Sequence, residues 1–308
     1  YYGCYMVFGV LGGNIFNFFR LRKYIRRENI IFSELHIKRH IKPVLKVFSF
    51  SVVTSIYLHL NSVLLGFFKN ALAVGYFTAA TKVMQMLLQM SSCLGSVMMP
   101  RASHLIAEKK DSEFNTLIQK SYDFTLAVAM PMTVGLIFCA PSLIATLCGS
   151  KFENSILPSQ IIAPIILMVA ISNVFGIQVL FPKGKINIVT LCCGIGAVAD
   201  LILNLCLIPF FSYVGTSIAY LGAEVATTVS MYFIGRKYIP IQYFKLSHLN
   251  YLLGCVMMAV VLIVISKLQL SSLNVLILQG CSGIIVYFIM LYLRKDAILV
   301  QVLSKIKK

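Results

Sequence analysis

The stretch Tyr76–Met90, "YFTAATKVMQMLLQM", carries a single charge, Lys82, inside an otherwise apolar run. No other charged residue occurs between Ala71 and Pro100, and this run is longer than the roughly 20 residues that a helix needs to cross a bilayer. The stretch therefore predicts a membrane-spanning helix with a cation within it. Such a charge costs about 2.5–3.5 kcal/mol at the bilayer centre on insertion scales, so its presence needs a reason.

The composition of the whole chain agrees with a membrane protein. The 308 residues are 59% hydrophobic and only 12% charged, with a mean hydropathy of +0.87. A soluble domain carries roughly a quarter charged residues. The nine cysteines fall in apolar segments without metal-ligand spacing, so we interpret them as small hydrophobic side chains and expect no metal site.

Nine segments have the length and hydropathy of spanning helices, which predicts an all-α, polytopic transmembrane bundle. They are about 1–19, 47–67, 73–99, 121–148, 157–181, 186–208, 213–235, 250–266 and 272–293. Pro131 and Pro164 lie inside two of them, where we expect kinks.

The distribution of basic residues supports this count. If successive connections alternate between the two sides of the membrane, one side receives 23 Lys and Arg residues and the other receives only Lys69, Lys151 and Lys267. Cytoplasmic loops are enriched in Lys and Arg, so we expect the richer side and the C-terminus to be cytoplasmic. The formal net charge of +17 then reflects this rule and contact with anionic lipids, and no base-reading motif predicts nucleic-acid binding.

The connections also predict the domain organisation. The basic segment 20–46 separates one predicted helix from eight others and resembles a cytoplasmic linker between two lobes. We expect 1–19 to end a first lobe, 47–235 to form a six-helix lobe, 250–293 to add two helices and 294–308 to be a cytoplasmic tail. Because the chain starts without Met and inside an apolar segment, we expect it to lack an N-terminal part.

Polar side chains follow one face of the predicted span 73–99. Thr78, Lys82, Gln85 and Gln89 recur at steps of four, three and four residues, which places them on one side of a helix. The opposite side is Met, Leu, Val and Ala. Such a helix lines a polar cavity or packs its polar face against another polar helix.

Other spans carry polar residues at helical spacing. Tyr57 and Asn61 lie in one span, Asp200 and Asn204 in a second, and Glu224 in a third. Together these faces predict a shared interior that water or a polar ligand enters. An alternative is that Lys82 pairs with Asp200 or Glu224 only to join helices.

Enzymatic function is disfavoured by the predicted outer loops. They are short, Glu153 is their only acid, and no nucleophile–base set or phosphate-binding loop occurs. A glycan transferase or ligase, or a membrane scaffold, is therefore the weaker alternative to a transporter.

Residues 57–103, "YLHLNSVLLGFFKNALAVGYFTAATKVMQ…VMMPRAS", resemble the start of the second lobe of Wzx-type polysaccharide flippases. These belong to the multidrug/oligosaccharidyl-lipid/polysaccharide (MOP) exporter superfamily. Three later stretches are also similar to the family: "NVFGIQVLFPKGK" (173–185), "GAVADLILNLCLIP" (196–209) and "GTSIAYLGAE" (215–224). The chain departs from the family pattern at Asn61, where the family often has Asp, and at Asp200, where Asn is expected.

The resemblance implies a fold of twelve to fourteen helices in two lobes around a central cavity. It implies a bacterial inner-membrane protein that flips a polyprenyl-pyrophosphate-linked oligosaccharide to the outer leaflet, with the missing half of the chain, membrane lipids and polysaccharide polymerase machinery as partners. No cofactor is implied beyond coupling to H⁺ or Na⁺. The alternatives within the superfamily are a lipid II-type flippase and a cation-coupled multidrug exporter.

The resemblance also sorts the polar residues into two expected sites. We expect a substrate cavity lined by Lys82, Thr78, Gln85, Gln89, Asn61 and Tyr57. We expect ion coupling to involve Asp200, Glu224 and Asn204.

Overall fold

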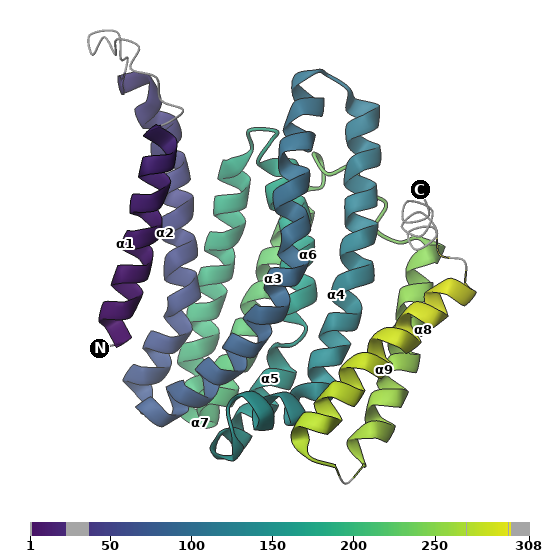
Figure 1. The fold of residues 1–308 in the computed structure, drawn as a ribbon. Coiled ribbons are helices and arrows are strands. Elements are labelled where there is room, and N and C mark those ends of the chain that lie inside the picture. The colour runs from purple at the N-terminus through teal and green to yellow at the C-terminus, as the bar shows by residue number, and fades with distance from the viewer. Residues whose placement is uncertain (1, 23–36, 269, 295, 297–308) are drawn as a thin grey trace. The chain divides into compact units, whose positions relative to one another are not determined.

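A computed structural model describes residues 2–22, 37–268, 270–294 and 296, and these residues form helices and short connections without a strand (Figure 1). The chain divides into two compact units, Tyr1–Leu45 and Lys46–Lys308. The first contains α1 (Tyr2–Arg22) and the beginning of α2 (Ile37–Phe68). Most of the predicted linker lies outside the described residues, although its last part, from residue 37, is helical.

The second unit holds the rest of the helices. After the end of α2 come α3 (Ala71–Ala107), α4 (Asp111–Leu147), η2 (Ser150–Ser155), α5 (Ile156–Ile162), α6 (Ile165–Asn173), the π-helix η3 (Val174–Leu180), α7 (Ile186–Gly235), α8 (Leu246–Ser266) and α9 (Ser272–Leu293). Within the described residues, each of the nine predicted spans lies on helix, apart from the turn residues 148, 163–164 and 181. The helices α3 and α4 extend beyond their predicted spans and leave only the turn at residues 108–110 between them.

The starts of α3 and α4 follow from local sequence. Asn70 precedes α3, and its Oδ1 accepts a hydrogen bond from the backbone N–H of Ala73 at 2.9 Å, which satisfies one free helix donor. Asp111 and Glu113 occupy the first turn of α4, where negative charge opposes the positive end of the helix dipole.

The 50-residue α7 is two helices that reverse direction at Ser212, where φ is +50° and ψ is −131°. Glycines bring the two limbs together. A Cβ at Gly196 would collide with Thr227 Oγ1, and one at Gly222 would lie 2.6 Å from a methyl carbon of Leu203. The predicted spans 186–208 and 213–235 are therefore the two limbs of one tight helical hairpin.

The predicted kink at Pro164 is confirmed. The pair Ser150–Ile162 and Ile165–Leu180 is bent by 44° at this break. In contrast, α4 continues through Pro131 as a single helix.

The described residues form a multi-pass membrane protein. Five helices are long and apolar enough to cross a bilayer, and the bent pair makes a sixth span if it is counted as one. Shorter apolar stretches occur in α1 (Val7–Leu21) and α2 (His59–Phe68).

The connections of the second unit gather at two ends (Figure 1). The turns between α3 and α4, before α7 and between α7 and α8 lie at one end, whereas the α2–α3 and α8–α9 turns lie at the other. The first group carries Lys109, Lys110, Lys183, Lys185, Arg236 and Lys237, among others. The predicted alternation of connections thus agrees with the arrangement of the helices.

Candidate functional site

A buried polar network joins α2 to the first limb of α7. Asn61 Nδ2 donates to Asp200 Oδ2 at 3.0 Å, and Asn204 Nδ2 donates to Asp200 Oδ1 at 3.0 Å and to Asn61 Oδ1 at 2.9 Å. Asn61 is 2% exposed, and Asp200 and Asn204 are fully buried. Because residues four apart lie on one helix face, Asp200 and Asn204 reach the same point on α2.

The network has one orphaned atom. Asn204 Oδ1 is buried without a hydrogen-bond partner among the described residues. A buried acceptor left unpaired costs roughly 1–3 kcal/mol, which a bound cation can offset. The two Asp200 oxygens and the amide oxygens of Asn61 and Asn204 are hard oxygen donors, the type that alkali and alkaline-earth cations prefer.

Lys82 lies in a different place, on the surface of α3. It is exposed, and with Thr78 it lines a pocket of about 550 Å³. The remaining wall is mostly apolar and includes Phe152 and Cys148, which follow α4. Within the described part of the chain, no ion pair joins Lys82 to a carboxylate.

The structure separates the residues that the sequence grouped. Asn61, expected to line the substrate cavity with Lys82, is hydrogen-bonded to Asp200, and it is not among the residues that line the Lys82 pocket. Gln85 and Gln89 are on α3 but do not line the Lys82 pocket. Glu224 is buried on the second limb of α7, and the side chain of Tyr57 lies outside the described residues.

One polar network was not predicted. Asp123 on α4 accepts from Lys245 Nζ at 2.7 Å and lies 3.0 Å from His248 Nε2, while Gln119 donates to its Oδ1 at 2.8 Å. Gln119 also accepts from the backbone N–H of Gln242 at 2.7 Å. The i, i+4 spacing of Gln119 and Asp123 was visible in the sequence, but their partners lie more than a hundred residues away.

Metal clusters of the usual protein type are absent from the described residues. No group of three His, Cys, Asp or Glu side chains there lies close enough to hold a metal ion. The oxygen-rich network at Asp200 depends on amides, which distinguishes it from such a cluster.

Comparisons with known proteins agree with this architecture. The family described as "Polysaccharide biosynthesis protein" matches residues 6–157. A Shigella dysenteriae protein, provisionally named as an O-antigen transporter, is 25% identical over 226 residues, covering 72% of this chain and 55% of its own length. The chain thus spans about half the length of this relative.

Two solved structures share the fold. The lipid II flippase MurJ in an inward closed conformation has a TM-score of 0.75 at 19% identity and covers 94% of this chain and 62% of its own. An outward-facing MATE-family multidrug transporter of the MOP superfamily has a TM-score of 0.57 at 15% identity, covering 84% of this chain and 65% of its own. At these identities the two structures show the fold, while the family match and the Shigella relative agree with the resemblance seen in the sequence.

Proposed function

We propose, on the premise that this chain is a polysaccharide-transporter-type protein of the MOP superfamily, that it forms part of a flippase for a lipid-linked oligosaccharide. The cargo is a polyprenyl-pyrophosphate oligosaccharide that moves from the inner to the outer leaflet of a bacterial plasma membrane. Support comes from the family match and from the O-antigen transport role in the name of the relative.

The observation that carries this proposal is the exposed Lys82. It lies within the candidate span Ala71–Met90, lines a pocket and has no carboxylate partner among the described residues. A cation exposed to hydrocarbon at this depth is costly, so the side chain must face water or another polar surface. An ammonium group is also a compact phosphate binder, which suits a pyrophosphate cargo.

The Asp200 network has a separate role in this proposal. Its carboxylate and the unpaired Asn204 Oδ1 are suited to hold Na⁺, and Asp200 alone can take up H⁺. Binding a cation there would bias the packing of α2 against α7, and thereby the opening of the transporter. The site residues for the cargo and for coupling would then lie on different helices.

Orientation follows from the distribution of charge. The connections rich in Lys and Arg, together with the C-terminal tail, would be cytoplasmic. Single cysteines placed next to Lys109 and Lys237 should react only from the inside, and those next to Lys151 and Lys267 only from the outside, in a background without reactive native cysteines. Labelling of all four positions from one side would contradict this orientation.

The role of Lys82 is tested in the complete gene product, expressed in cells that lack their own polysaccharide flippase. Lys82→Ala should remove surface polysaccharide while protein abundance stays normal. Lys82→Arg should retain partial transport, because the charge is kept but its compact shape is not. Thr81→Ala, a neighbouring change outside the pocket, is the matched control and should transport normally.

The alternative, in which Lys82 only pairs with a buried acid, makes a different prediction. Removing both partners would then restore transport, since no buried charge would be left unpaired. The double variants Lys82→Ala with Asp200→Asn and Lys82→Ala with Glu224→Gln should instead remain inactive. Recovery in either one would reject the phosphate-binding role.

A further inference from the structure

The α7–α8 connection, residues 236–245, lies at the end of the second unit that is rich in Lys and Arg (Figure 1). Arg236 and Lys237 are exposed at its start. At its other end, Phe244 is 97% exposed, and Leu246, the first residue of α8, is 86% exposed. Exposed basic and exposed apolar side chains are thus combined in one short segment.

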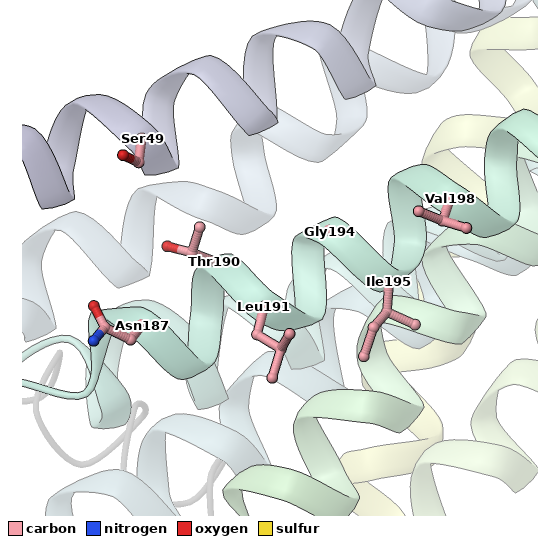
Figure 2. A pocket seen from close by; sticks show the side chains of 7 residues that line it. All are labelled: Ser49, Asn187, Thr190, Leu191, Gly194, Ile195 and Val198. Carbon is pink, nitrogen blue, oxygen red and sulfur yellow. The ribbon is translucent and has the colours of Figure 1, made fainter.

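The pocket of about 710 Å³ between Ser49 on α2 and the first limb of α7 lacks this combination (Figure 2). Its lining includes Asn187 and Thr190 as well as apolar side chains, but it includes no charged residue. An uncharged lining of this kind favours no particular lipid headgroup. The α7–α8 connection differs because its exposed cations distinguish between neutral and anionic partners.

The backbone that carries Phe244 is held in place on both sides. Gln242 donates its N–H to Gln119 Oε1 at 2.7 Å, and its carbonyl accepts from Gln119 Nε2 at 3.3 Å. After Phe244, Lys245 Nζ donates to Asp123 Oδ2 at 2.7 Å. Phe244 lies between these two attachments to α4, so a fixed backbone directs its ring outward.

The two ends of the connection lie near each other. Arg236 interacts electrostatically with Tyr243, the residue that precedes Phe244. The Tyr243 ring packs against Tyr232 at the end of α7, with 4.8 Å between the ring centres. The sequence contains no Asp or Glu from residue 225 to residue 295, so this part of the chain carries only positive charge.

The length of α8 places the connection at the edge of the membrane. The 21 residues of α8 span about 32 Å at 1.5 Å per residue, which is close to the roughly 30 Å thickness of the hydrocarbon layer. Leu246 then lies where the hydrocarbon begins, and Phe244 lies in the headgroup region. Insertion there removes two large apolar side chains from water, which is favourable.

We propose that the α7–α8 connection is a binding surface for anionic phospholipids of the adjacent leaflet. Phe244 and Leu246 insert beside the acyl chains, while Arg236 and Lys237 face the negatively charged headgroups. Because Gln242 and its neighbours attach the same segment to α4, a bound lipid also holds the start of α8 at a fixed depth. The inference does not depend on the cargo of the transporter.

The absence of tryptophan makes the depth of the surface measurable. Phe244→Trp adds a single fluorophore to the 308-residue chain, and Val256→Trp, at a 53% exposed position in the middle of α8, is the matched control. Both proteins are reconstituted with phospholipids that carry bromine, a tryptophan quencher, either near the headgroup or near the chain ends. Bromine near the headgroup should quench more strongly at position 244, and bromine near the chain ends should quench more strongly at position 256.

Headgroup preference is measured in the Phe244→Trp protein by competition between brominated phosphatidylglycerol and unbrominated phosphatidylcholine, and with the bromine exchanged between them. Each basic residue near an anionic surface contributes about a fivefold preference, so phosphatidylglycerol should be favoured by roughly 25-fold. Arg236→Gln with Lys237→Gln should bring this ratio close to one. Lys109→Gln with Lys110→Gln removes equal charge from the α3–α4 turn at the same end and should leave the ratio unchanged.

Three results would overturn the anionic-lipid surface. One is the absence of quenching at position 244, which would show that the ring faces water or protein. Another is equal affinity of phosphatidylglycerol and phosphatidylcholine at this position. The third is the same loss of preference in both double variants, which would reflect net charge alone. Polysaccharide export is not measured here, so the proposed function can fail or hold independently of these results.

Discussion

The polar contacts that attach α8 and α9 to α4 differ from those between α2 and α7. Along α4, Asp123 is paired with Lys245 and His248, Ser142 donates to Gln279 at 2.6 Å, and the Tyr287 hydroxyl donates to the Ala127 carbonyl at 2.7 Å. We call this set the α4 clamp. At the α2–α7 contact, by contrast, the side-chain partners of Asp200 among the described residues are amides, and the network keeps an unpaired buried oxygen.

The difference indicates two uses of polar residues within one membrane bundle. In the α4 clamp, each named donor meets an acceptor, so these residues stabilise the attachment of α8 and α9. In the Asp200 network, the carboxylate has no cationic partner among the described residues and one amide oxygen is unpaired, which is the arrangement that the proposed cation site would use. Stability should therefore respond to changes in the clamp, and transport to changes in the network.

The largest effect is expected from removing the carboxylate of the Asp200 network, or from moving it to a neighbouring position. Asp200→Asn should reduce transport in the complete gene product by about 5–150-fold, the range of a typical coupling free energy. The swap Asn61→Asp with Asp200→Asn should restore much of it, because one carboxylate returns to the same three-residue network. Surface polysaccharide, normalised to protein abundance, is the measurement. A swap as inactive as the single variant would argue against a shared cation site.

The next effect is on stability. Asp123→Ala should lower the free energy of unfolding by about 1–3 kcal/mol, since Lys245 and His248 lose their acceptor in a mostly buried place. Thermal unfolding in detergent and protein abundance would show the loss. Transport per molecule should stay near normal. A transport defect at full protein abundance would contradict the view that the α4 clamp serves stability and the Asp200 network serves transport.

Two glycines on the first limb of α7 should respond with opposite signs. Gly196→Ala should destabilise by about 1–3 kcal/mol, because its Cβ would collide with Thr227 and push the first limb, which carries Asp200, away from the second. Gly194→Ala, two residues earlier and facing open space, should stabilise by about 0.5–1 kcal/mol. Unfolding midpoints of both variants check this, and a shared sign would show that the limbs do not pack as described.

The smallest expected effect comes from a single hydrogen bond in the α4 clamp. Tyr287→Phe removes the donor to the Ala127 carbonyl but keeps the ring, and hydrogen bonds between membrane helices average about 0.6 kcal/mol. We expect a small decrease in thermal stability and unchanged transport. Tyr292→Phe, an exposed position on α9, is the control for tyrosine removal and should have no effect on stability.

Much of the fold could be predicted from local sequence. Hydropathy set the positions of the spans, because about 20 apolar residues are needed to cross a bilayer, and the basic residues assigned connections to two ends. The bend at Pro164 followed from its missing N–H. The motifs around Lys82 carried the resemblance to polysaccharide flippases, and the polar stripe on α3 placed Lys82 and Thr78 on one face.

Only the tertiary structure decided which polar residues meet. Helical periodicity gives the face on which a side chain lies, but not how each helix is rotated or displaced against its neighbours. The sequence therefore grouped Asn61 with Lys82 as an expected cavity residue, and only the packing revealed its hydrogen bond to Asp200, 139 residues away. The partners of Asp123 and the pairing of Lys82 could not be predicted from the sequence either. Contacts between helices that are distant in sequence depend on the packing of the whole bundle.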